Sequence, residues 1–217
     1  MFKYLIALLL FAPPALAEPS KGYYTMDSMG CMILGECTED VSEVWGVDMI
    51  KERYNDADWT PVELEIQRML NALTLIGVNV YIAPERYFPP GHRGVYHTVT
   101  NNFYLNDAFM KRPSVFMTVM RHEGWHAAQD CMAGTIDNSM IAIIKPEEDV
   151  PKIWREMVEK TYPKSAVPWE AEAKWAGLTE GMTQNALESC ANGTMWTDYK
   201  PTPLTRKWLI ENGFIKN

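Results

Sequence analysis

The sequence predicts an α+β fold, in which a short, mostly antiparallel sheet packs on one long buried helix and further helices follow. Three observations carry this prediction. Apolar and polar residues alternate, as in strands, in parts of 78–106. An apolar helical stretch follows at 113–131, and the rest of the chain shows helical spacing of apolar residues. Strands followed by a run of helices are typical of the α+β class.

Residues 1–17 have the composition of a secretory signal peptide. Lys3 gives the positive start, residues 4–11 are apolar, and Ala15-Leu16-Ala17 is an A-x-A cleavage site. The apolar run is shorter than the roughly 20 residues of a membrane-spanning helix, which is the alternative interpretation. We therefore expect export to the periplasm or the extracellular space, cleavage near Ala17 and no membrane span in the mature chain.

The rest of the chain divides into an N-terminal extension, 18–59, and a domain, 60–217. The extension is polar and Met-rich, with one short helix expected between 41 and 53, and it is either a removable pro-segment or a wrap over the domain. The net charge of −8 argues against nucleic acid or an anionic membrane as the main partner. On net charge alone, basic substrates are slightly favoured.

The cysteines are even in number, which in an exported chain suggests two disulfides. Three pairings of Cys31, Cys37, Cys131 and Cys190 are open. We prefer Cys31–Cys37 with Cys131–Cys190, because the first pair closes a short local loop. A cysteine ligand to a metal is the alternative, although the sequence has no C-x-x-C spacing.

Turn and capping residues divide the domain into elements. Thr60-Pro61 should begin a helix that runs to about Leu75. Residues 78–82 alternate as a strand, and two short alternating runs within 94–106 predict a β-hairpin. Helices are then expected within 113–131, 146–162, 168–181, 183–191 and 203–212.

Residues 122–126 read His-Glu-Gly-Trp-His, the H-E-x-x-H pattern. Side chains four apart lie on one helix face, so His122 and His126 can reach one metal ion, with Glu123 as a general base for a metal-bound water. The surrounding 113–131 segment is apolar, and burying these polar groups is costly without a partner. The alternative is a structural helix that carries this pattern by chance.

A catalytic zinc site usually has three protein ligands and one open position. A helix expected to begin at Pro168 carries Glu170 and Glu172, which face roughly opposite sides, so only one of them should bind the metal. We prefer Glu170. Two glutamates in the first turn also stabilise a helix through its dipole and need no metal.

The H-E-x-x-H motif, followed by Glu170-x-Glu172-Ala173, resembles the gluzincin metallopeptidases. The resemblance implies a zincin-like fold in which His122, His126 and Glu170 hold Zn²⁺. It further implies that Glu123 is the catalytic base and that the substrate is a peptide or protein.

The same resemblance implies that the predicted hairpin contains the edge strand that aligns the substrate by main-chain pairing. The chain departs from the family at Lys174, where an Asp or Asn often supports a zinc-binding histidine. Another group, such as Glu172, would then have to orient His122 or His126.

Several further side chains have two interpretations. Tyr96 or His97 could stabilise an oxyanion, but either is more typical of hairpin surface. Gln129 could support the metal site, although a solvent-facing side chain is favoured, and His92 should be exposed. Two sets of large apolar residues are expected in the core rather than on a binding surface: Trp154, Trp169, Trp175 and Met117, Met120, Met132.

Two other functions stay open. A fourth protein ligand, such as Glu172 or His97, would close the site and make the zinc structural, in a catalytically inactive zincin-like domain with a binding role. The third hypothesis is an exported protein that is stabilised by disulfides and binds no metal.

Overall fold

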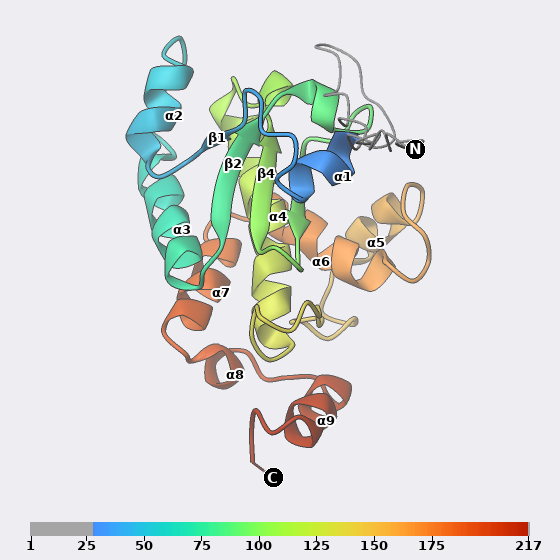
Figure 1. The fold of residues 1–217 in the computed structure, drawn as a ribbon. Helices are drawn as coiled ribbons and strands as arrows, with labels where there is room; N and C mark the ends of the chain where they lie inside the picture. The colour runs from blue at the N-terminus through green and yellow to red at the C-terminus, as the bar shows by residue number, and fades with distance from the viewer. Residues whose placement is uncertain (1–27, 217) are drawn as a thin grey trace, which may run out of the picture.

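In the computed structural model, residues 28–216 are described, and they form a four-stranded mixed sheet packed on a long helix, followed by a helical C-terminal part (Figure 1). The α+β prediction is therefore confirmed. The strands are β1 (Ser42–Glu43), β2 (Asn79–Ala83), β3 (Gly94–His97) and β4 (Asn102–Asn106). The helices are α1 (Ser28–Ile33), α2 (Val47–Arg53), α3 (Glu63–Leu75), η1 (Glu85–Tyr87), η2 (Asp107–Phe109), α4 (Pro113–Met132), α5 (Lys152–Val158), α6 (Val167–Gly177), α7 (Met182–Ala191), α8 (Met195–Asp198) and α9 (Pro203–Glu211).

The strand order in the sheet is β1-β2-β4-β3. The predicted hairpin is present, since β3 and β4 pair antiparallel through Gly94↔Leu105 to His97↔Asn102. The central pair, β2 and β4, is parallel, because β4 returns between β2 and β3 instead of extending a meander. The sheet is therefore mixed, and β3 is one of its edges.

Helix α4 lies between the sheet and the C-terminal helices. It packs against β3 and β4 on one side and against α6 and α7 on the other, and Figure 1 shows it running along the sheet. Most of its side chains are buried, including Phe116 and Trp125. Met117, Met120 and Met132 are buried as predicted, whereas the three tryptophans of the other set are only half-buried.

Some helix ends differ from the prediction. Helix α3 begins at Glu63, because Thr60 and Pro61 form a turn in which the backbone N–H of Thr60 donates to Asp58. Helix α5 covers only part of 146–162, since Pro151 disfavours helical geometry in the residue before it. Five short elements were not predicted from the sequence: α1, β1, η1, η2 and α8.

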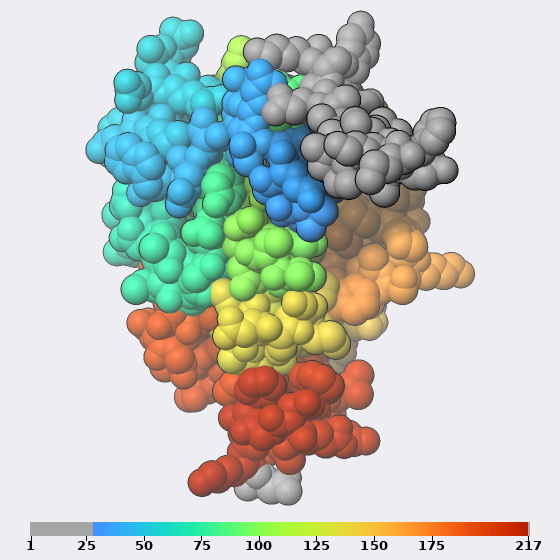
Figure 2. Space-filling view, viewed as in Figure 1, coloured from blue at the N-terminus to red at the C-terminus, as the bar shows by residue number. Residues whose placement is uncertain are grey.

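Residues 28–59 pack on the rest of the described chain. Val47, Ile50 and Trp59 belong to the main hydrophobic core, and a second cluster includes Met32 and Tyr87. Figure 2 shows the N-terminal residues in blue and the C-terminal residues in red at opposite ends of the molecule.

The preferred disulfide pairing is confirmed: Cys31 bonds Cys37, and Cys131 bonds Cys190. The second bond ties the end of α4 to α7. Disulfides persist in oxidising compartments, so the two bonds suggest such a compartment for this protein. The predicted signal peptide, 1–17, lies outside the described residues, and within 28–216 no helix is both long and apolar enough to cross a membrane.

Candidate metal centre

Helices α4 and α6 approach each other closely and run in opposite directions. Gly177, at the end of α6, makes this approach possible. A β-carbon there would lie 3.0 Å from the carbonyl oxygen of Thr118 and 3.3 Å from the β-carbon of His122. At the start of α6, Glu170 faces His122 and His126.

The close packing brings three metal-ligating side chains together. The Nε2 atom of His122 lies 3.4 Å from Oε2 of Glu170, and Nε2 of His126 lies 3.8 Å from Oε1 of Glu170. One ligand atom from each residue falls within 4.8 Å of the others. Ligand atoms around a tetrahedral zinc ion are about 3.4 Å apart, so the spacing fits the ion.

The Glu170 carboxylate gives an independent test of the fit. Its Oε2 atom is buried and has no hydrogen-bond partner among the described residues. A buried, unpartnered carboxylate oxygen is costly unless a cation or donor reaches it. Two imidazoles and one carboxylate are a donor set typical of zinc, so the residues fit the metal that the sequence predicts.

The three side chains are electrostatically coupled. Burial alone would raise the pKa of Glu170, but the two imidazoles and the Tyr162 hydroxyl outweigh it and lower the pKa. Burial alone would lower the pKa of His122, but Glu170 and Glu123 outweigh it and raise the pKa. Glu170 is therefore ionised at neutral pH, in the form that binds a metal.

Glu172 faces away from the histidines and is fully buried. Its carboxylate accepts hydrogen bonds from the side chains of Trp125 and Gln129 and from the backbone N–H groups of Ile144 and Lys145. Burial raises the pKa of Glu172, and these donors offset part of that rise. The glutamate that joins the two histidines is therefore Glu170.

Gln129 is buried and links Glu172 to His126, so the favoured solvent-facing prediction was wrong. Its Nε2 donates to the carbonyl oxygen of Trp169 at 3.2 Å and to Glu172 at 2.8 Å. Its Oε1 lies 2.8 Å from Nδ1 of His126. Because the amide nitrogen is already committed to two acceptors, Oε1 must accept, and Nδ1 of His126 carries the proton.

Glu123 is held by the edge strand of the sheet. The backbone N–H of Tyr96 donates to its Oε2 at 3.0 Å. No hydrogen bond among the described residues involves its Oε1. Strand and helix come this close because residue 94 is glycine: a β-carbon there would lie 2.7 Å from Val119 Cγ1 and 2.9 Å from Glu123 Cγ.

A cleft of about 620 Å³ opens beside His122 and Glu123. Three elements beside α4 form its walls: the loop before β3, the end of α5 with the residues that follow it, and α6. The exposed His92 lines it, as does Tyr162. The residues that line it are Pro90, Gly91, His92, Arg93, Gly94, Thr118, Val119, His122, Glu123, Met157, Val158, Thr161, Tyr162, Lys174 and Gly177.

The sequence analysis missed Tyr162 as a functional candidate. Burial, together with the charges of Glu170 and Glu123, raises the pKa of Tyr162, so its hydroxyl keeps its proton at neutral pH. In sequence it stands at the end of an expected helix, directly before Pro163. No motif marks that position, so only the return of the chain to α6 relates it to the candidate metal ligands.

The two predicted oxyanion candidates lie elsewhere. The Tyr96 hydroxyl donates to the buried carboxylate of Asp130 at 2.8 Å. Nδ1 of His97 lies 2.9 Å from the hydroxyl oxygen of Thr100. Neither residue lines the cleft.

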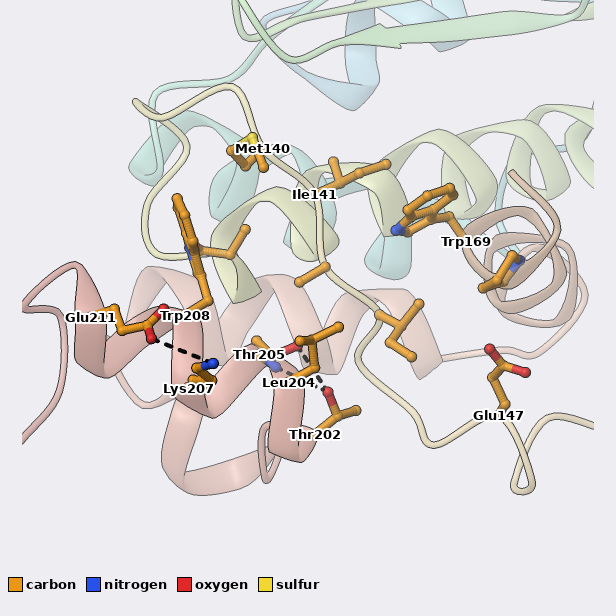
Figure 3. Close-up of a pocket in the computed structure, with 14 residues that line it drawn as sticks. Met140, Ile141, Glu147, Trp169, Thr202, Leu204, Thr205, Lys207, Trp208 and Glu211 are labelled. Carbon is orange, nitrogen blue, oxygen red and sulfur yellow. Dashed lines mark hydrogen bonds and ion pairs between the residues drawn. The ribbon is translucent and has the colours of Figure 1, made fainter. Parts of the chain in front are cut away.

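A second cavity, of about 490 Å³, lies between the segment after α4 and helix α9 (Figure 3). Its lining is largely apolar and includes Ile141, Trp169 and Trp208. Lys207, one of its charged residues, is paired with Glu211 at 3.7 Å. This cavity offers no metal-ligating cluster among the described residues, so the cleft beside α4 is the candidate site.

No protein-family model matches the chain, and neither the curated proteins nor the solved structures contain a significant match.

Proposed function

We propose that this chain is an exported zinc-dependent hydrolase of the gluzincin type that cleaves peptide bonds. The observation that carries the proposal is the meeting of His122, His126 and Glu170, with one unpartnered carboxylate oxygen, beside a cleft that Glu123 lines. Each of these residues would take the role that the sequence motif predicts for it.

His122, His126 and Glu170 would hold Zn²⁺, with Nε2 of His126 available as a ligand because Nδ1 carries the proton. The bound ion would supply a water of lowered pKa and polarise the scissile carbonyl. The free Oε1 of Glu123 would take the proton of that water and pass it to the leaving amine. The N–H of Tyr96 holds the other oxygen, Oε2, so the carboxylate is oriented in advance.

Tyr162 would donate a hydrogen bond to the oxygen that becomes negative during the reaction. It lines the same cleft as Glu123, and its raised pKa keeps the hydroxyl protonated. A donor placed where charge develops stabilises the transition state more than the ground state.

The substrate would lie along β3. This strand is an edge of the sheet, so one side of its backbone can pair with an extended peptide. The Tyr96 N–H already contacts Glu123, which means that pairing along this strand would bring a peptide bond next to the base.

The alternative of a structural zinc needs a fourth protein ligand. Glu172 is engaged by four N–H donors, and His97 does not belong to the ligand group. The open cleft next to His122 favours a position for water instead. The alternative without metal leaves the buried Oε2 of Glu170 without a hydrogen bond, with the His122 imidazole 3.4 Å away as its neighbour.

The test is zinc content and peptide hydrolysis in the purified protein, in wild type, Glu170→Ala and Glu123→Gln. We expect one zinc per chain in wild type and Glu123→Gln, and none in Glu170→Ala. Hydrolysis should be lost in both variants. A Glu123→Gln protein that holds zinc and keeps full activity would falsify the mechanism, and a zinc-free wild type after zinc addition would remove the metal site.

A further inference from the structure

Two cationic side chains line the cleft: Arg93, in the loop before β3, and Lys174, on α6. Among the described residues that line it, Glu123 is the one acidic side chain, and the proposed mechanism assigns that group to the reaction. The cleft therefore carries a local positive charge in a chain whose net charge is −8.

The two cations belong to different walls of the cleft. Lys174 is one helical turn beyond Glu170, toward Gly177, which packs on Thr118. Arg93 directly precedes Gly94, which packs on Val119. Arg93 and Lys174 therefore come from two different walls of one cleft, which His122 and Glu123 also line.

Neither cation has an anionic partner among the described residues. No ion pair or hydrogen bond there involves the Lys174 ammonium, and Arg93 makes only a cation–π contact, 5.4 Å from the centre of the Phe109 ring. Some of the other described arginines are paired, such as Arg121 with Glu65 and Arg53 with Asp107. Two unpaired cations across one cleft are thus available to an anionic ligand.

We propose that Arg93 and Lys174 bind a carboxylate of the substrate on the C-terminal side of the scissile bond. The inference rests on the proposed function. Antiparallel pairing is the more stable arrangement of two strands. A peptide antiparallel to β3 would place its C-terminal part beside Gly94 and Arg93, where β3 begins. The carboxylate is either the free C-terminus of a peptide or an Asp or Glu side chain near the cleaved bond.

The first test is digestion of random hexapeptides, prepared as free acids and as C-terminal amides, with products identified by mass spectrometry. The zinc-loaded wild type should prefer peptides that carry a carboxylate after the cleaved bond. If C-terminal amidation abolishes the preference, the cations bind the free C-terminus of the peptide. If amidated peptides with an Asp or Glu after the cleaved bond are still preferred, the cations bind that acidic side chain. Lys174→Gln and Arg93→Gln should each reduce the preference ~10-fold, because each removes one charge-assisted hydrogen bond.

The matched controls are Lys207→Gln and Arg68→Gln, which remove the same charges outside the cleft. Both should behave as wild type. Equal cleavage of acidic and neutral peptides by wild type, or the same preference in all four variants, would overturn the inference while leaving the proposed hydrolase intact.

A second readout does not depend on cleavage. Dansyl-labelled pentapeptides that differ by a single Glu-to-Gln change are titrated into zinc-loaded Glu123→Gln protein, and binding is followed by fluorescence anisotropy. The Glu peptide should bind more tightly, and adding Lys174→Gln should remove the difference. Identical affinities for the two peptides would contradict the inference, whether or not the wild type hydrolyses peptides.

Discussion

The Oε1 atom of Gln129 lies 2.8 Å from Nδ1 of His126, and the Gln129 amide nitrogen donates to the buried Glu172. The chain of contacts therefore runs from Glu172 through Gln129 to one of the candidate zinc ligands. It fixes the tautomer of His126 and leaves its Nε2 atom, 3.8 Å from Oε1 of Glu170, available to a metal ion. Lys174 stands at the position where the gluzincin metallopeptidases, which the motifs resemble, often have an Asp or Asn that supports a zinc-binding histidine. In this chain Gln129 contacts His126 instead.

Replacing Gln129 by leucine should weaken zinc binding by about 10- to 100-fold, because His126 loses the acceptor that fixes its tautomer. Competition with a fluorescent chelator measures the affinity. Gln67→Leu, on the exposed face of α3, is the control. Unchanged affinity in Gln129→Leu would mean that the hydrogen bond does not orient the ligand.

Glu172→Ala should lower the free energy of unfolding by about 3 kcal/mol, because it leaves several buried N–H donors without an acceptor. Urea unfolding measures the loss. In the fraction that stays folded, zinc content should remain at one per chain, in contrast to Glu170→Ala. Loss of zinc from folded Glu172→Ala would reassign the third ligand.

Asp130 should make stability depend on pH. Burial raises the pKa of Asp130 to about 7, from 3.8 for the exposed group, and Oδ1 has no partner among the described residues. Between these values the folded protein holds the proton more tightly than the unfolded chain does. The stabilising contribution is therefore complete below about pH 4 and is lost as the pH rises through about 7.

Asp130→Asn stays neutral at every pH, so it should be more stable than wild type at pH 8 by on the order of 1 kcal/mol, with little difference at pH 4. Unfolding midpoints in urea at both pH values give the comparison. Asp149→Asn, at an exposed position, should follow wild type. A parallel pH profile for Asp130→Asn and wild type would refute this assignment.

Gly94→Ala should reduce hydrolysis at least ~10-fold while zinc stays bound, because misplacing a catalytic group by about 1 Å can cost about 100-fold in rate. The new β-carbon would meet Val119 and the Glu123 side chain below 3.0 Å, so Glu123 or the edge strand must move. Initial rates and zinc content are measured together. Gly30→Ala, which has open space for a β-carbon, is the control, and equal rates in both would show that this contact does not position the base.

We infer that residues 28–59 stay with the folded domain rather than leaving as a pro-segment. They contribute Val47, Ile50 and Trp59 to the main core. A chain that begins at Thr60 should therefore lose cooperative unfolding, because each fully removed large side chain costs about 2–5 kcal/mol. Thermal unfolding followed by circular dichroism is the measurement. A cooperative transition at the wild-type temperature would favour a removable segment.

The sequence by itself determined the features that depend on local spacing. Apolar periodicity predicted the long buried helix α4, and the alternation in 94–106 predicted the hairpin. The i, i+4 spacing of His122 and His126 put two imidazoles on one face, because that distance is a property of the helix alone. The short loop between Cys31 and Cys37 favoured one of three possible disulfide pairings, and the structure confirms that pairing.

Only the tertiary structure decided which distant groups meet. The helical pattern alone does not distinguish Glu170 from Glu172. The orientation of α6 against α4 places Glu170 next to the histidines and buries Glu172 among N–H donors. The same packing buries Gln129 and brings Tyr162, Arg93 and Lys174 to the lining of one cleft. These contacts join segments far apart in the chain. Their geometry depends on how side chains fill the space between elements, and local sequence periodicity carries no information about that packing.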